Sequence, residues 1–336
     1  MTITTTRRGG QPATWLRILR TCGCDDPQNL DPIGKVLLIT RACVQPMTLT
    51  SVAIAGLLAA RSSSFDGLWF GLSAIGSVVA HAANNMINDY FDLTEGLDDT
   101  QYPRAEYAPH PVLSGATTKR GLKRAILAAN AIDASIMIVL AAARGWPIVA
   151  FAVAGLSISV FYVAPPLRLK ARGLGEPSVA LIWGPVMVGG TYYAAVGRLP
   201  SSVLLASIPY ACLVTTVLMG KHIDKMPWDS NANIRTLPVI LGNERSRQLT
   251  VLLMGAFYVS IAGLALSGSL DAWALIGSPH CLPSSKRHAR FVNRSLLNLR
   301  ATTHCGLCGT AHGPSCMQET PELFSSLVLR SALSGR

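Results

Sequence analysis

Charged residues are scarce in this chain. Asp, Glu, Lys and Arg together make up 14% of its 336 residues, whereas soluble domains carry about 25%. Hydrophobic residues make up 50%, and the mean hydropathy is +0.36. This balance excludes an ordinary soluble domain and predicts a protein that crosses a lipid bilayer several times.

Other absences narrow the class further. The eight cysteines lack the spacing of a secreted disulfide scaffold. Cys22 and Cys24 are too close together for a zinc site of the usual spacing, so we assign them no role. No apolar segment with a cleavage site follows the first arginines, so no cleavable signal peptide is expected. The net charge is +11, but Lys and Arg lie in short loops between apolar runs. That pattern is typical of membrane topology, and no nucleic-acid partner is expected.

Several apolar runs are long enough to cross a bilayer as helices. They cover residues 36–60, 67–88, 124–143, 146–164, 178–197, 201–220 and 249–268, and an eighth run begins at Asp271 and stops early. The predicted fold class is therefore all-α, a polytopic membrane helical bundle. Lys and Arg are concentrated in the loops after the second, fourth and sixth spans. We therefore expect these loops and the N-terminus to face the cytosol, at the plasma membrane of a prokaryote.

The two ends of the chain differ from the middle. Residues 1–34 are polar and basic and predict a loosely ordered arm, with a short interfacial helix around Trp15 to Leu19. Residues 35–277 form the predicted membrane domain. Residues 278–336 change composition abruptly, which indicates a disordered or frameshift-derived tail. Cys305, Cys308, His312 and Cys316 in this tail resemble a zinc knuckle. Both gaps beside the histidine are one residue short, so a zinc site is the less favoured interpretation.

A first acidic cluster closes the second span, within residues 84–98. On a helix, Asn88 and Asp92 are i,i+4 neighbours and Asp89 and Asp92 are i,i+3 neighbours, so their oxygens converge on one side. Converging hard oxygens suit Mg²⁺, which takes one or two carboxylates together with water and substrate phosphate. The alternative is a solvated helix end that happens to carry acidic residues.

A second cluster follows the sixth span, where Asp224 and Asp229 lie close to Lys221 and Arg235. The second and sixth spans are four apart, as expected if two similar halves face a shared site. Two acidic clusters with basic loops between them suit a diphosphate held through Mg²⁺. The rest of such a pocket would be apolar, so the expected ligand has an anionic head and a long hydrocarbon tail.

The loop after the fourth span lies between the clusters in sequence. Tyr162 precedes two prolines that end the helix, so its ring lies near the membrane rim. There the ring would face a developing cation or simply occupy the membrane interface, as tyrosines often do. Arg168, Lys170 and Arg172 either bind a diphosphate or only set the topology.

These motifs together resemble the UbiA-type intramembrane prenyltransferases, and among them the branch that prenylates 1,4-dihydroxy-2-naphthoate for menaquinone. Asn88-Asp89-Tyr90-Phe91-Asp92 is similar to the first family motif, with Gly96 where many members carry a further Asp and Asp98 two places on. Leu174-Gly175-Glu176 and the stretch from Gly184-Pro185 to Tyr193 also resemble that branch. The similarity covers residues 41–242.

Three departures from the family pattern stand out. Asp224 and Asp229 are one residue further apart than in the family's second motif, and the following run is Asn233-Ile234-Arg235-Thr236-Leu237-Pro238. His110 replaces an arginine of the family. The tail replaces the last one or two of the family's nine transmembrane helices.

The resemblance implies Mg²⁺-dependent transfer of a polyprenyl group from a prenyl diphosphate to an aromatic acceptor of the quinone-precursor type. It assigns catalysis to Asp89, Asp92, Asp224 and Tyr162. It assigns substrate binding to Asn88, Arg104, Lys119, Arg168, Lys170, Lys221 and Arg235. It assigns metal binding to Asn88, Asp89, Asp92, Asp98, Asp224 and Asp229.

Two other functions stay open on the sequence. A transporter would carry acidic residues at the midplane of its spans, and apart from Asp133 in the third span this sequence places none there,. An inactive family member is the second alternative, because a chain without the final helices would not close its lipid-facing pocket.

Overall fold

The computed structural model describes residues 11–96 and 108–267. By compactness the chain divides into two units, Met1–Ser260 and Ile261–Arg336. The helical bundle belongs to the first unit, and of the second the structure describes only residues 261–267. The described residues are helical apart from turns and one isolated bridge between Arg172 and Arg235. The predicted all-α class is confirmed.

The chain begins with two short helices, α1 (Gln11–Thr21) and α2 (Pro32–Ile39). The longer helices are α3 (Pro46–Ala59), α4 (Gly67–Thr94), α6 (Lys119–Arg144), α7 (Trp146–Val163), α9 (Met187–Val196), α10 (Ser201–Asn231) and α12 (Asn243–Leu266). Short elements connect them: η1 (Ala42–Val44), η2 (Leu169–Ala171), α8 (Gly175–Leu181), η3 (Ile182–Val186) and α11 (Leu237–Leu241).

Six helical stretches in the described residues are long and apolar enough to cross a membrane. They are Ala42–Ala59, Lys119–Arg144, Trp146–Val163, Gly175–Val196, Ser201–Asn231 and Asn243–Leu266. The predicted span at 67–88 forms α4 but is not among the six, because residues such as His81 and Asn84 lower its hydropathy. With 28 residues, α4 is about 42 Å long at 1.5 Å per residue and still exceeds a bilayer core of about 30 Å.

Two predicted spans are interrupted. The first ends at Ile39 and restarts at Pro46, because Arg41 adopts a left-handed conformation with φ 51° that a helix cannot contain. The fifth is divided by η3, where Gly184 has non-helical dihedrals and Pro185 lies inside the helix. Proline lacks the N–H that the preceding turn needs, so a local change of helix type is expected there.

The sequence predicted a loosely ordered N-terminal arm, but from residue 11 onward the arm is folded. Ile18 of α1 is 1% exposed and packs with Leu30 and Leu38. Trp15 Nε1 donates to Asp31 Oδ1 at 2.8 Å, and Asp31 also caps α2, accepting from Gly34 N,. The predicted interfacial helix around Trp15 lies within α1, and this part of the arm is folded.

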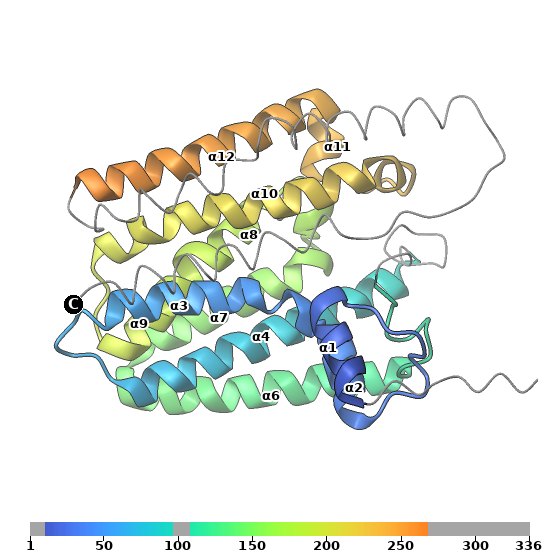
Figure 1. Cartoon of the computed structure of the whole chain (residues 1–336), viewed down its shortest axis with the longest axis horizontal. Helices are drawn as coiled ribbons and strands as arrows, with labels where there is room; N and C mark the ends of the chain where they lie inside the picture. Colours follow the sequence, from blue (N-terminus) through green and yellow to red (C-terminus); the bar gives the residue numbers. More distant parts are fainter. Residues whose placement is uncertain (1–10, 97–107, 268–336) are drawn as a thin grey trace, which may run out of the picture. The chain divides into compact units, whose positions relative to one another are not determined.

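The helices of the bundle lie side by side in Figure 1, with α4 packed against α3, α6, α7 and α9. Small residues allow this close packing, as where Ala55 and Ala59 of α3 meet Val188 and Tyr192 of α9,. The helices α1 and α2 lie at the end of the bundle where α4 finishes (Figure 1). The polar residues of α4 are therefore collected at one end of the molecule.

Candidate active site

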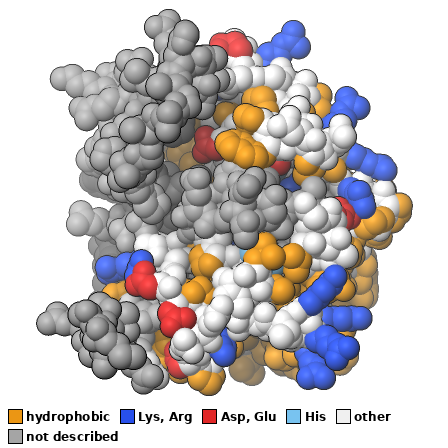
Figure 2. Space-filling view, turned by 90° about the vertical axis from the view of Figure 1, so that its right-hand side faces the viewer, with side chains coloured by type: hydrophobic (Ala, Val, Ile, Leu, Met, Phe, Trp, Pro, Cys, Tyr) orange, Lys and Arg blue, Asp and Glu red, His pale blue; other side chains and the backbone are white. Residues whose placement is uncertain are grey.

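The first acidic cluster occupies the last two turns of α4, as expected. Asp89 is 0% exposed and Asp92 is 6% exposed. Figure 2 looks onto the end of the bundle shown on the right of Figure 1, where Lys and Arg side chains lie mostly along the right-hand edge of the view, with acidic and apolar side chains toward its centre. Buried carboxylates need cationic or hydrogen-bonding partners, so the partners of these two define the site.

Arg41 holds Asp89 with two hydrogen bonds. Arg41 Nε donates to Asp89 Oδ2 at 3.2 Å, and Arg41 Nη2 donates to Asp89 Oδ1. The left-handed residue Arg41 lies in the break between α2 and α3. Asn85 Nδ2 fixes this break to α4 by donating to the Thr40 carbonyl at 3.2 Å. The forked geometry of a guanidinium suits a carboxylate, and no local sequence pattern indicates this pairing over 48 residues.

His110, which replaces an arginine of the family, binds the backbone beside Asp89. Its Nδ1 accepts from the backbone N–H groups of Val112 at 3.1 Å and Leu113 at 3.3 Å. Nε2 therefore carries the ring proton and donates to the Asp89 carbonyl at 3.1 Å,. The side chain is buried, with 6% exposed. Its hydrogen bonds connect the loop before α6 to α4.

Lys170 holds Asp92 in the same way. Its Nζ donates to Asp92 Oδ1 at 3.2 Å and to Oδ2 at 3.1 Å. Asn88 Nδ2 donates to Asp92 Oδ2 at 2.9 Å. Nearby, Arg168 Nη2 pairs with Glu95 Oε1 at 2.6 Å. The loop after α7 is thus fastened to the end of α4 by two of the cations that are predicted to bind diphosphate.

The second cluster lies on a helix, since α10 continues to Asn231, eleven residues beyond the predicted span. Its buried face carries His222, Lys225 and Asp229, which are 3%, 7% and 1% exposed. The spacing of three and four residues places these side chains on one helix face.

Asp224 is not on that face. It is exposed and lies within electrostatic range of Arg247 on α12. Asp229 is five positions after Asp224, which corresponds to about 140° around a helix at 3.6 residues per turn. Asp224 and Asp229 therefore lie on different faces of α10, because the motif contains one extra residue; that both carboxylates serve one site stays a prediction.

The loops that follow α7 and α10 meet. Arg172 and Arg235 form a parallel β-bridge, and Ile234 N donates to the Asp229 carbonyl at 2.8 Å. Gly173 has φ +73°, and a Cβ there would lie 2.5 Å from Ile240 Cδ1. The left-handed backbone at this position therefore favours glycine. The side chain of Arg235 is exposed, at the junction of the two loops.

Tyr162 lies between the clusters. A Cβ on Gly175 would be 3.3 Å from the Tyr162 hydroxyl oxygen. The phenol is within electrostatic range of Glu176, Asp92 and Asp229. Tyr162 thus lies beside Gly175 at the start of α8, within electrostatic range of carboxylates on both α4 and α10.

The remaining predicted residues are placed less centrally. Lys119 Nζ lies 5.4 Å from the centre of the Tyr90 ring, as a cation–π contact. Lys221 is half-buried on α10, one residue before His222. Asp98 and Arg104 lie outside the described residues. Sequence reasoning missed Arg41, Lys225, Glu176 and His222, because their burial depends on contacts between distant helices.

The residues suit a divalent metal in their chemistry. No group of three or more His, Cys, Asp or Glu side chains in the described part of the chain is arranged to hold a metal ion. Mg²⁺ needs only one or two protein carboxylates, since water and substrate phosphate fill its other positions. Asp89 and Asp92 offer such oxygens one helical turn apart, with Asn88 beside Asp92. Arg41 and Lys170 balance their charge.

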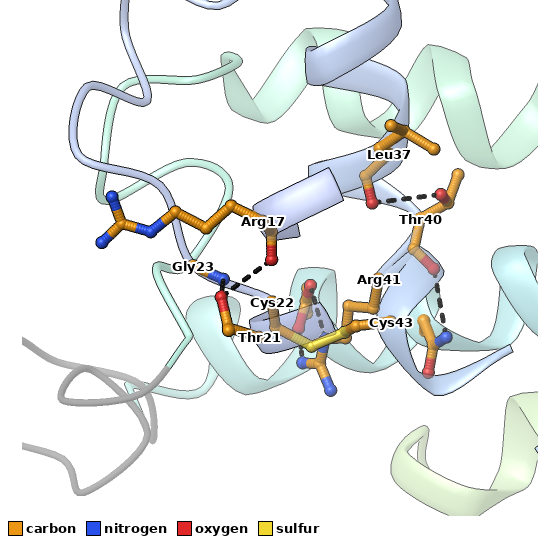
Figure 3. The surroundings of a disulfide bond; sticks show 10 residues. Arg17, Thr21, Cys22, Gly23, Leu37, Thr40, Arg41 and Cys43 are labelled. Carbon is orange, nitrogen blue, oxygen red and sulfur yellow. Dashed lines mark hydrogen bonds and ion pairs between the residues drawn. A yellow bond between two sulfur atoms is a disulfide. The ribbon is translucent and has the colours of Figure 1, made fainter. Parts of the chain in front are cut away.

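A disulfide borders the site, which corrects the expectation that Cys22 has no role. Cys22 at the end of α1 is bonded to Cys43 in η1. Figure 3 shows Arg41 beside this disulfide, two residues before Cys43. Cys24 is a free, half-buried thiol, and burial raises its pKa. The disulfide joins the N-terminal helices to the segment that carries Arg41.

Comparisons with known proteins agree with this arrangement. The chain is 23% identical to 1,4-dihydroxy-2-naphthoate octaprenyltransferase of Bacillus subtilis, over 74% of this chain and 79% of that protein. It is 25% identical to UbiA prenyltransferase domain-containing protein 1 of Danio rerio, over 71% of each. The fold is similar to that of a UbiA homologue from Archaeoglobus fulgidus bound to DMAPP and Mg²⁺. There the TM-score is 0.57 at 18% identity, covering 89% of this chain and 98% of the other.

The family model of the UbiA prenyltransferases matches residues 49–300. This region contains both acidic clusters and Tyr162. The chain is an integral membrane protein and a prenyltransferase, and it belongs to the UbiA prenyltransferase family.

Proposed function

We propose that this enzyme transfers a polyprenyl group from a prenyl diphosphate to an aromatic acceptor of the quinone-precursor class in a Mg²⁺-dependent reaction. The first acceptor to test is 1,4-dihydroxy-2-naphthoate, which the names of several relatives contain. The observation that carries the proposal is that Lys170, on the loop after α7, binds Asp92 of the first cluster, while the same loop is bridged at Arg172 to Arg235 on the loop after the second cluster.

Asp89, Asp92 and Asn88 on α4 and Asp229 on α10 would hold the metal. When bound, Mg²⁺ neutralises the diphosphate and makes its departure easier. Structures of UbiA homologues from Archaeoglobus fulgidus are described with DMAPP, GPP and Mg²⁺, which supports this assignment. Asp98 was assigned to the same metal site and stays a prediction.

The basic residues would bind and orient the diphosphate. Lys170 is best placed, because its ammonium already lies on Asp92 and can shift to a phosphate oxygen when the carboxylate binds metal. Arg168 on the same loop and Arg235 on the adjoining one extend the positive charge. Lys119, Lys221 and Arg104 complete the set proposed from the sequence.

Tyr162 would stabilise the allylic cation with its ring face. The C–O bond to the diphosphate breaks, and both electrons leave with the diphosphate. A ring carbon of the acceptor then forms a C–C bond with the allylic carbon. The displaced group is a proton, or carbon dioxide where the ring carbon carries a carboxylate.

The polar end of the bundle would face the cytosol, where a charged prenyl diphosphate head is accessible. The apolar tail would lie along the helices in the bilayer. The N-terminal helices and the three basic loops are proposed on the cytosolic side of a prokaryotic plasma membrane, since Lys and Arg concentrate in those loops,.

The test is prenyl transfer in isolated membranes that contain this chain, with labelled long-chain prenyl diphosphate and a panel of aromatic acceptors. Product that requires Mg²⁺ and is lost in Asp92→Ala supports the proposal and names the acceptor. The exposed variant Glu244→Gln is the matched control and should form product normally. A folded protein that forms no product with any acceptor would contradict it and would favour an inactive family member.

A further inference from the structure

Glu176 and His222 form a buried pair that the proposed function does not use. His222 Nδ1 and Glu176 Oε1 are 2.8 Å apart, and the two side chains are 4% and 2% exposed. The residues come from α8 and α10, which pack against each other. A carboxyl group buried this deeply is costly unless its oxygens are hydrogen-bonded.

Only one oxygen of Glu176 is satisfied within the described residues. Oε1 receives the His222 ring, whereas Oε2 is buried and has no hydrogen-bond partner there. Buried polar atoms without a partner are rare in folded proteins, so such an atom requires a specific explanation. A ligand that donates a hydrogen bond would remove the cost.

The position of the pair indicates which ligand this is. Glu176 follows Gly175, against which the Tyr162 hydroxyl lies, and its carboxylate is within electrostatic range of that phenol. His222 is within electrostatic range of Lys170, the residue that binds Asp92. The free oxygen therefore belongs to the same neighbourhood as the expected allylic cation and diphosphate.

We propose that Glu176 Oε2 accepts the hydrogen bond of a ring hydroxyl on the aromatic acceptor, and that His222 is a positioning residue for Glu176. This rests on the proposed function, because it names the group that binds the second substrate. The acceptors that fit are phenols and hydroquinones with a free hydroxyl conjugated to the ring carbon that is prenylated.

The carboxylate would also promote the reaction. As the ring carbon bonds to the allylic carbon, the hydroxyl proton moves to Glu176 Oε2 and the ring becomes a neutral ketone. The prenylated carbon then loses carbon dioxide, or gives up its proton to the departed diphosphate, and the aromatic ring is restored. The oxygen then takes back the proton from Glu176, so the carboxylate ends in its starting form.

The test compares a hydroxylated acceptor with its methyl ether in purified wild-type protein and in Glu176→Gln. The expected result for Glu176→Gln is a fall of about 100-fold in kcat/KM for the hydroxyl acceptor, the size of a lost general base. The methyl ether should react equally slowly with both proteins, because it has no proton to donate. A purely structural role of Glu176 would reduce both acceptors alike and would overturn the proposal.

Two measurements keep this result separate from folding and from the proposed function. Prenyl diphosphate binding by Glu176→Gln should match that of the wild type, and Glu244→Gln, an exposed glutamate, is the matched control for activity. If Glu176→Gln does not fold, Glu176→Asp keeps the carboxylate and should show a smaller fall. Wild-type protein that transfers no prenyl group overturns the proposed function, whereas normal transfer by folded Glu176→Gln overturns only this inference.

Discussion

Each buried carboxylate of the first cluster has its own cation. Asp89 is paired with Arg41 and Asp92 with Lys170. Within the cluster of Asn88, Asp89 and Asp92, the contact between Asn88 and Asp92 was predictable, because it depends only on helical spacing,. The cationic partners of the carboxylates were not, because Arg41 and Lys170 lie 48 and 78 residues away in sequence and reach the site only through tertiary packing.

The Arg41 pairing can be tested through stability. Arg41→Ala leaves the fully buried Asp89 without its guanidinium, which is expected to cost about 3–5 kcal/mol. The melting temperature in detergent should fall clearly. The double variant Arg41→Ala with Asp89→Asn removes both charges and should recover part of the loss. An unchanged melting temperature for Arg41→Ala would show that the pair contributes little.

The two carboxylates of the second cluster should differ in importance. Asp229 is buried beside the loop junction and Asp224 is exposed, so Asp229→Asn is expected to lower prenyl transfer about 100-fold, as for a lost group that stabilises the transition state. Asp224→Asn should lower prenyl transfer by no more than about tenfold. Initial rates at saturating Mg²⁺ measure both. Equal losses would mean that α10 turns or bends at Pro227 when substrate binds.

At the scale of elements, apolar runs located the membrane helices but not their interruptions. The runs at 124–143 and 146–164 became α6 and α7 with small shifts of boundary. The break at Arg41 depends on a left-handed residue and on its contact with α4, which no local pattern contains. The extension of α10 past Pro227 was also missed, since proline usually ends a helix.

The disulfide between α1 and η1 should contribute to stability. It closes a loop with a sequence separation of 21 residues, for which the chain-entropy model gives about 3 kcal/mol. Reduction should lower the melting temperature of the wild type to that of Cys22→Ser. Cys24→Ser, which removes a free thiol, is the control and should melt like the wild type before and after reduction. A reductant effect that persists in Cys22→Ser would point to another cause.

The junction of the loops after α7 and α10 depends on Gly173. Gly173→Ala adds a Cβ 2.5 Å from Ile240 Cδ1 at φ +73°, where the left-handed conformation alone costs about 1–2 kcal/mol. We expect a lower melting temperature and a higher KM for the prenyl diphosphate, because the loop carries Lys170 and Arg168. Gly255→Ala, with open space around its Cβ position, should cause neither change. A normal KM in folded Gly173→Ala would separate this junction from donor binding.

At the scale of the whole molecule, the first unit collects its chemistry at one end of a helical bundle (Figure 1). Long helices α4 and α10 each carry their acidic residues on the final turns, as the comparison of the second and sixth spans predicted. The membrane class followed from composition alone. The position of Tyr162 near both clusters did not follow from composition, because it depends on how α7 packs against α4 and α8 packs against α10.

The most direct measurement is Mg²⁺-dependent binding of a non-reactive prenyl thiodiphosphate to the purified protein and to Asp92→Asn and Asp229→Asn. One carboxylate lies on α4 and the other on α10. A single shared site predicts that each variant loses most of the metal-dependent affinity, and that the double variant is little worse than either. Wild-type affinity in Asp229→Asn would contradict the shared site and leave α4 as the only helix that binds the diphosphate.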